Sequence, residues 1–409
     1  MLPRAIFLLG VLPFLAAQVL VEIQSFPQNA VLFHRGERVP PFQRLADSTL
    51  YTLPEGEQRL TLSAYGYQPS SFTLTISRAG QVHRTRLLPQ GGPLTFLGEV
   101  KTGSQPKSVR FTPNGRHLIV TLLNDTHCEV FQVRPLQRVA KLEFLGFGQQ
   151  RGFVESWILP KRNELWISQM TTSQVHVFRL DDFTYRESFS TKGLWPKVIL
   201  VDRNEKWGYV SNWSSNNVSV IDVEKRQVIR LIPTPGTPRG LALSPDERVL
   251  YVANFEQASV QRYSLPNFEE LPAIKVGSFG AMRHLVVQGH HLYASDMATG
   301  RVYRFNALRG EFEAELPLGL NLNTIDVAQN SSLLFASSRG RNNPESYLLV
   351  GPEYGKVFVV DANRFTLMGW VWGRNQPTGL SVSPDRRLVA FTDFLSDNLE
   401  LFAINKWEE

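Results

Sequence analysis

One strand-turn-strand segment recurs along most of the chain, and this repeat limits the possible folds more than any other feature. Each copy has an apolar strand, a short polar turn and a second apolar strand, and leaves room for two further strands before the next copy. Clear copies are PKSVRFTPNGRHLIVTLL at Pro106, PKVILVDRNEKWGYVSNW at Pro196, PRGLALSPDERVLYVANF at Pro238 and PTGLSVSPDRRLVAFTDF at Pro377, and weaker ones begin near Phe153, Met282 and Leu322. The chain is therefore predicted to consist largely of copies of one small sheet.

The period and the number of copies predict an all-β architecture with seven sheets around a common axis. Aligned copies lie 40 to 55 residues apart, a spacing typical of a propeller with four strands in each unit. One such sheet is unstable alone, whereas radial stacking buries both of its apolar faces. We expect a seven-bladed β-propeller over residues 94–409, in which residues 94–100 supply the missing fourth strand of the last blade.

A separate module is predicted over residues 18–90. Short alternating runs divided by turn residues favour a small β-sandwich in front of the propeller. The runs cover residues 19–23, 30–34, 48–53, 58–64, 71–77 and 81–87. The motif Pro54-Glu55-Gly56-Glu57, with a Gly66-Tyr67 turn, resembles the PEGA domain. That resemblance implies interaction with other components of a cell envelope.

The repeats resemble the YVTN family of β-propellers. The signature reads Tyr209-Val210-Ser211-Asn212 in one copy and Tyr251-Val252-Ala253-Asn254 in the next. The resemblance covers residues 94–404 and implies the fold strongly. It implies little about function, because the same architecture hosts many activities.

The N-terminal residues favour export. Arg4 precedes an apolar run over residues 5–17 that is too short to span a bilayer, and Ala16 and Ala17 suit a cleavage site. We predict a signal peptide over residues 1–17 and an exported protein that is periplasmic, cell-envelope associated or secreted, with no membrane span. An apolar N-terminal strand is the alternative. Cys128 is the single cysteine, so no intramolecular disulfide can form.

Four of the aligned repeat starts are cationic. Lys107, Lys197, Arg239 and Arg283 would ring one mouth of the central channel if their strands are innermost, and such a ring attracts anions. The alternative is that polar residues simply begin surface strands. A net charge of +6 permits an anionic partner without requiring one.

Aromatic residues and an insertion add candidate contacts. Trp213 and Phe255, with Trp157 and Trp195, could form a stacking platform or could fill gaps between blades. Residues 339–354 lengthen the sixth repeat, and long loops on rigid scaffolds tend to carry function. We expect Arg339, Arg341 and Tyr347 to contact a partner.

No catalytic, metal or cofactor site is predicted. The histidines fall at unlike repeat positions, and no Gly-x-Ser-x-Gly motif, paired cysteines or phosphate loop is present in the sequence. We expect a monomeric binding protein whose partner is an anionic ligand, a glycan or an envelope protein. One alternative is a lactonase-like hydrolase or lyase, in which Glu155 or His284 would meet a metal in the channel, and another is nucleic-acid binding through the cationic mouth.

Overall fold

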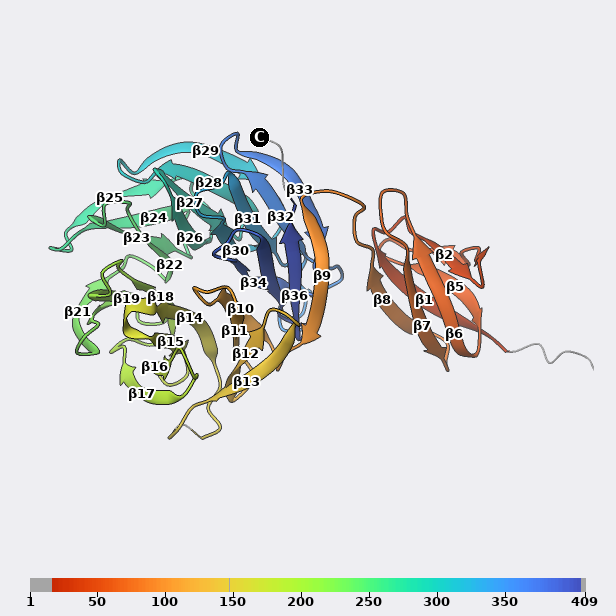
Figure 1. Cartoon of the computed structure of the whole chain (residues 1–409). Coiled ribbons are helices and arrows are strands. Elements are labelled where there is room, and N and C mark those ends of the chain that lie inside the picture. Colours follow the sequence, from red (N-terminus) through yellow and green to blue (C-terminus); the bar gives the residue numbers. More distant parts are fainter. Residues whose placement is uncertain (1–16, 147, 406–409) are drawn as a thin grey trace, which may run out of the picture. The chain divides into compact units, whose positions relative to one another are not determined.

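The computed structural model describes residues 17–146 and 148–405, and in this part of the chain strands dominate (Figure 1). The chain divides into two compact units at residues 90 and 91. Over the described residues there are nine four-stranded sheets and one short 3-10 helix, Pro160–Arg162. None of the helices found there is long and apolar enough to cross a membrane. The predicted signal peptide lies outside the described residues, apart from Ala17.

The N-terminal unit is a small β-sandwich, as the sequence predicts. One sheet has the order β4(Gln43–Arg44), β5(Thr49–Pro54), β1(Gln18–Phe26), β8(Gln81–Arg86), and the other has the order β3(Glu37–Arg38), β2(Val31–His34), β6(Gly56–Ser63), β7(Ser70–Ile76). The alternating apolar residues meet in a core that includes Val21, Leu32, Tyr51 and Leu60. All six expected strands are present. The two additional strands, β3 and β4, are too short to leave a periodic pattern.

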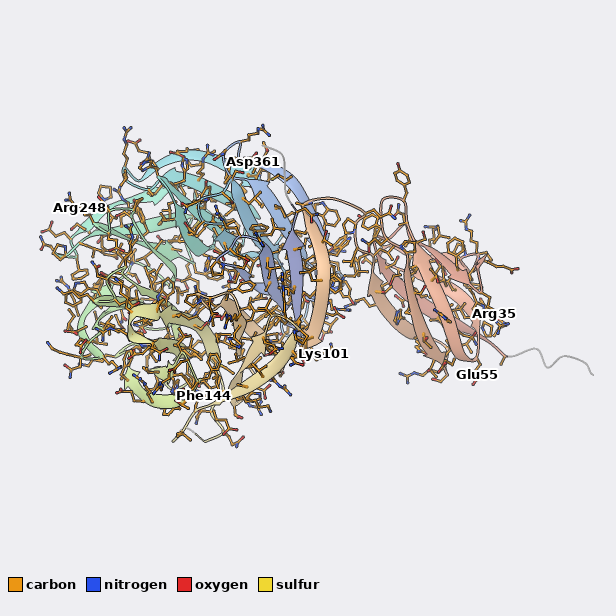
Figure 2. The ribbon with its side chains drawn as sticks, in the orientation of Figure 1. Arg35, Glu55, Lys101, Phe144, Arg248 and Asp361 are labelled. Carbon is orange, nitrogen blue, oxygen red and sulfur yellow. The ribbon has the colours of Figure 1, made fainter. Side chains whose placement is uncertain are left out.

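The turn between β5 and β6 carries the chain from one sheet to the other. Glu55 lies in this turn (Figure 2). Gly56 has a φ of 98°, a conformation that residues with a side chain rarely adopt. The Pro-Glu-Gly motif is therefore the sandwich's crossing point between its two layers.

The second unit is a β-propeller of seven sheets over the described residues from 91 to 405. Blades 1 to 3 are β10(Pro106–Phe111), β11(His117–Leu122), β12(His127–Gln132), β13(Gln137–Glu143); β14(Phe153–Leu159), β15(Glu164–Gln169), β16(Gln174–Arg179), β17(Tyr185–Ser190); and β18(Pro196–Val201), β19(Trp207–Asn212), β20(Asn217–Asp222), β21(Gln227–Pro233). Blades 4 and 5 are β22(Pro238–Leu243), β23(Val249–Asn254), β24(Ser259–Ser264), β25(Glu270–Lys275); and β26(Met282–Gln288), β27(His291–Asp296), β28(Arg301–Asn306), β29(Glu311–Pro317). Blades 6 and 7 are β30(Leu322–Val327), β31(Leu333–Ser338), β32(Lys356–Asp361), β33(Thr366–Trp372); and β34(Pro377–Val382), β35(Leu388–Asp393), β36(Asn398–Ile404), β9(Leu94–Lys101). The first strands of neighbouring blades contact one another around the ring, and we call them the inner strands.

The ring closes with a strand from its beginning. β9 pairs antiparallel with β36, from Leu94 opposite Ile404 to Lys101 opposite Asn398 (Figures 1 and 2). The carboxylate of Glu99 on β9 also accepts hydrogen bonds from Arg374 and Asn398. The predicted closure is therefore confirmed.

The propeller core lies between blades. One cluster joins Val198 and Val218 of blade 3 to Leu241 and Val252 of blade 4. Burying an aliphatic side chain of this size contributes roughly 1.5–3 kcal/mol. Because these contacts reach across from one sheet to the next, each blade depends on its neighbours.

A repeated hydroxyl group ties neighbouring inner strands together. In each inner strand the register with the second strand shifts after the first residue, as in a β-bulge. In blade 3, Ser211 Oγ accepts a hydrogen bond from the Val198 amide at 3.1 Å and donates one to the Arg239 carbonyl of blade 4 at 2.8 Å. Equivalent hydroxyl groups belong to Thr121, Ser168, Ser295, Ser337 and Thr392. The serine of the repeat signature therefore links adjacent blades.

Blade 4 differs at this position. Ala253 replaces the serine, and the joint to blade 5 is made by close backbone approach instead. A Cβ placed on Gly240 would lie 2.8 Å from the Leu285 amide nitrogen and 2.9 Å from His284 Cα. Glycine is therefore required where β22 meets β26.

We predict that Ser211→Ala lowers the free energy of unfolding by about 1–3 kcal/mol, because it leaves buried backbone groups without a partner. Chemical denaturation followed by tryptophan fluorescence measures the change. The matched control is Ser214→Ala at an exposed loop position, where a change within about 0.5 kcal/mol is expected. Equal effects of the two substitutions would contradict the structural role of the hydroxyl group.

We also predict that a chain beginning at Thr102 fails to fold cooperatively, whereas a chain beginning at Gly91 does fold. The shorter chain loses β9 and leaves β36 as an unpaired edge. Circular dichroism during thermal unfolding distinguishes a single sharp transition from a broad one. A sharp transition in the shorter chain would show that closure is dispensable.

Candidate functional site

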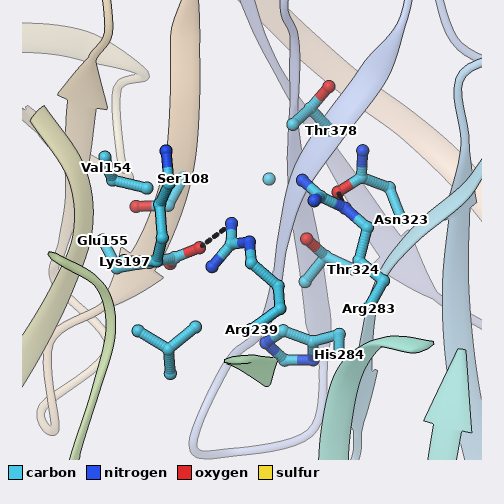
Figure 3. A network of polar contacts seen from close by, with 12 residues as sticks. Ser108, Val154, Glu155, Lys197, Arg239, Arg283, His284, Asn323, Thr324 and Thr378 are labelled. Carbon is cyan, nitrogen blue, oxygen red and sulfur yellow. Dashed lines mark hydrogen bonds and ion pairs between the residues drawn. The ribbon is translucent and has the colours of Figure 1, made fainter. Parts of the chain in front are cut away.

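The second residue of each inner strand lies at one end of the channel. These residues are Lys107, Val154, Lys197, Arg239, Arg283, Asn323 and Thr378. The bulges described above fall at this position, and bulges commonly redirect side chains next to binding sites. Figure 3 shows Arg239, Arg283, Asn323 and Thr378 reaching toward the same space from different blades.

The structure brings together the four cations singled out in the repeat. Arg339, the first residue after β31, joins them, and the five interact electrostatically. We call Lys107, Lys197, Arg239, Arg283 and Arg339 the mouth cations. Arg239 and Arg339 are only 4% exposed, so these side chains are not merely the solvated starts of surface strands.

Few partners within the described structure neutralise the mouth cations. Glu155 Oε1 lies 3.4 Å from Arg239 Nη2, and Arg283 Nε donates to Asn323 Oδ1 at 2.7 Å (Figure 3). Arg239 Nη1 and the Nε and Nη2 atoms of Arg339 are buried and have no hydrogen-bond partner among the described residues. Burying such donors is costly unless a partner accepts their hydrogen bonds. The mouth therefore presents unused guanidinium donors.

The positive potential of the mouth is visible in the pKa values of its own side chains. Burial and then the neighbouring cations Arg239 and Arg283 lower the pKa of Lys197 to about 7. Burial, followed by Arg339 and the other mouth cations, holds the pKa of Lys107 well below its usual value. Burial also lowers the pKa of Arg339 to about 10. An anion placed here would relieve this repulsion.

Aromatic rings partly compensate the mouth cations. The Lys197 ammonium lies 5.2 Å from the Trp195 ring and 5.5 Å from the Trp213 ring. Trp213 in turn lies 4.7 Å from Phe255, ring centre to ring centre. The structure thus places two of the four candidate platform aromatics beside one cation, where cation-π contact stabilises it, and a third behind Trp213.

The buried ring of Phe394 serves two further cations. It lies 4.8 Å from the Lys107 ammonium and 5.5 Å from the Arg339 guanidinium. Phe394 follows the signature of the last repeat, at the position of Trp213 and Phe255 in other blades. This equivalent position in the repeat could have identified Phe394, which we did not single out from the sequence.

Of the three residues predicted to act in the inserted segment, two lie at the mouth and one does not. Arg339 is a mouth cation, and the ring of Tyr347 lies 6.0 Å from its guanidinium. Arg341 instead pairs with Glu353, with Nε 3.5 Å from Oε2, and lies half-exposed outside the electrostatic cluster. The structure therefore does not bring Arg341 to the site, because an acidic residue of the same segment holds it.

A cavity of about 550 Å³ occupies the channel beyond the mouth. Trp157 lines it, 4.7 Å from the Arg110 guanidinium, so this tryptophan does not join the aromatics around Lys197. Trp157 is the fifth residue of β14 and lies well inside the channel. Burial raises the pKa of Asp326, which also lines the cavity, to about 6. Arg110 and Asp326 were missed, although a charged residue inside an apolar inner strand was a usable signal.

The residues considered for catalysis are otherwise engaged. Glu155 is paired with Arg239, and burial together with nearby arginines lowers the pKa of His284 to about 3. Among the residues that the structure describes, no group of three or more His, Cys, Asp or Glu side chains could hold a metal ion.

Comparison with known proteins places this geometry in context. No protein-family model matches the chain. A chain of hydrazine synthase from Kuenenia stuttgartiensis superposes with a TM-score of 0.64, covering 75% of this chain and 98% of that one at 17% identity. That likeness shows the propeller fold alone.

Sequence similarity is closer to a second protein. Antigen Lp49 from Leptospira interrogans serogroup Icterohaemorrhagiae serovar copenhageni (strain Fiocruz L1-130) is 32% identical over 400 residues. The match covers 94% of this chain and 88% of Lp49, so it includes both the sandwich and the propeller. The chain belongs to the family of antigen Lp49.

Proposed function

We propose that this protein is an exported binding protein whose propeller mouth receives an anionic group of its ligand. The observation that carries the proposal is the set of buried guanidinium donors on Arg239 and Arg339 without partners among the described residues. A carboxylate or phosphate accepts such donors in pairs, and the contact is strong because both partners are charged. Nearby Asn323 Nδ2, which also has no partner among those residues, offers one more donor.

The mouth suits a discrete anion better than a long polyanion. Its three arginines are buried and its two lysines half-buried, whereas a nucleic-acid backbone usually follows an exposed basic groove. Glu155 on the inner side limits how far a negative group can enter (Figure 3). A single phosphate or carboxylate at the end of a larger ligand fits these limits.

We propose binding rather than catalysis at this site. The alternative, a channel hydrolase or lyase, would need Glu155 or His284 to meet a metal, and the described residues place neither in a group of three potential ligands. Glu155 is held by Arg239, and the lowered pKa of His284 makes it a weak base.

Export and the family of the two units belong to the same proposal. The apolar run over residues 5–17 has the form of a signal peptide, and a relative named as an antigen is a protein that antibodies encounter. We assign the sandwich to the PEGA type and the propeller to the YVTN type on their motifs. The sandwich would then serve as an attachment or spacer, and the propeller would present the mouth.

The proposal predicts that the purified protein binds pyrophosphate, and that Lys197→Glu with Arg239→Glu reduces the affinity at least about tenfold. Isothermal titration calorimetry measures it. Arg116→Met is the matched control, because this exposed cation lies in the turn between β10 and β11, at the opposite end of the strands from the mouth.

Three results would contradict the proposal: no pyrophosphate binding by the unaltered protein, equal loss in the control, or binding retained in the double reversal. An arm with a single-stranded oligonucleotide separates the nucleic-acid alternative. Affinity for the oligonucleotide that rises with its length and exceeds that for pyrophosphate would favour that alternative.

The proposal also predicts proton uptake on binding. With a pKa of about 7, Lys197 is mostly neutral at about pH 8, and a bound anion favours its charged form. Affinity should therefore fall as pH rises above about 7, and the measured enthalpy should differ between buffers of different ionisation enthalpy. Lys197→Arg keeps the charge at all these pH values, so it should retain binding and reduce the buffer dependence. A buffer-independent enthalpy for the unaltered protein would contradict this assignment.

A further inference from the structure

The loops of the propeller form two sets at opposite ends of the strands. Because the four strands of a blade are antiparallel, the loop that enters the inner strand and the loop between the second and third strands lie at the same end. In blade 3, for example, Pro196 pairs with Asn212, and Asn212 pairs with Asn217. We call these the mouth loops, because they surround the mouth cations, and the remaining connections the far loops.

Exposed apolar residues are concentrated on the mouth loops. Phe279, between β25 and β26, is 73% exposed. The other large exposed apolar residues on mouth loops are Leu145, Leu194, Trp195, Leu320, Tyr347, Leu348, Leu349 and Val350. On the described far loops, only Leu308, between β28 and β29, is a large exposed apolar residue. One end of the propeller thus carries an apolar rim, which marks an interaction surface.

Runs of charged residues are frequent in the far loops. The far loops contain stretches such as DRNEK at residues 202–206, SPDER at 244–248 and SPDRR at 383–387. Two mouth loops that carry apolar tips read KGLW at 192–195 and GSFG at 277–280, whereas the inserted segment at 339–354, which carries four more tips, also contains Arg339, Arg341, Glu345 and Glu353. The most highly charged turns therefore lie at the far end of the ring, and the apolar tips surround the cationic centre at the mouth end.

We propose that the mouth end docks on a bilayer that contains anionic phospholipid, with a headgroup phosphate at the mouth cations and the apolar rim in the interfacial layer. The inference rests on the proposed function and names the source of its anion. Charge complementarity and the distribution of the rim both point to this occupant. A free anion would leave the rim in water, and a soluble protein would need an acidic protrusion at the centre of an apolar ring.

The form of the rim suits a flat, yielding surface. Its tips come from separate loops of several blades. Leu194 and Phe279 each have an adjacent glycine in the sequence. Trp195 and Tyr347 are the residue types that favour the boundary between headgroups and acyl chains. Apolar contact and attraction to anionic lipid together provide reversible binding, and neither requires a membrane-spanning segment.

Sedimentation with vesicles tests the inference. The purified protein should sediment with vesicles of phosphatidylcholine that contain phosphatidylglycerol, and much less with phosphatidylcholine alone. The triple variant Phe279→Ser, Leu348→Ser, Leu349→Ser should have a partition coefficient between water and vesicles that is at least about tenfold lower, because the apolar contact is lost. Leu308→Ser, 44% exposed on a far loop, is the matched control and should bind as the unaltered protein does.

The pyrophosphate titration separates failure of this inference from failure of the proposed function. Intact pyrophosphate binding without vesicle binding overturns the inference, leaves the proposed function standing and favours a soluble partner. Vesicle binding that survives the rim substitutions, or that Leu308→Ser reduces equally, also overturns it. Vesicle binding with no pyrophosphate binding overturns the proposed function and with it the headgroup assignment. Loss of vesicle binding in the rim variant with normal pyrophosphate affinity supports the inference and excludes misfolding.

Discussion

The structure depends on closure of the ring. Each blade buries its apolar faces against its neighbours, so a gap at any joint would expose two core surfaces at once. β9 removes that gap, because it brings the start of the propeller to its end and pairs along the full length of β36. Hydroxyl groups such as that of Ser211 then fix adjacent inner strands to each other. The result is a rigid frame that does not rely on disulfide bonds.

Such a frame can hold charges in an unfavourable arrangement. The mouth cations repel one another, and their burial removes the water that would otherwise stabilise them. Packing of the whole ring offsets this local cost, while the rings of Phe394 and Trp213 lower it. Clusters of like charge held in this way are common where a ligand of opposite charge completes the structure.

The periodic parts of the molecule could be read from the sequence. The turn residues and apolar strands recur at fixed positions. The repeat therefore predicted the propeller, the strand that closes it and the common position of Lys107, Lys197, Arg239 and Arg283. Whether these cations bind a ligand remains a prediction.

The non-periodic parts could not be read in the same way. Arg341 was grouped with Arg339 on proximity alone, but pairing with Glu353 depends on how an irregular segment folds back. Trp157 lies in the channel because of its place five residues along β14, which an alignment of strand starts does not reveal. The apolar rim arises only when loops distant in sequence meet at one end of the ring.

Gly240 has a consequence for the opening itself. It leaves no room for a Cβ between β22 and β26, and it lies immediately after Arg239 and opposite the backbone beside Arg283. Any side chain there would wedge the two strands apart and carry the two guanidinium groups with them. The width of the opening that a negative group can enter is thus set by a residue that has no side chain and does not itself contact the ligand.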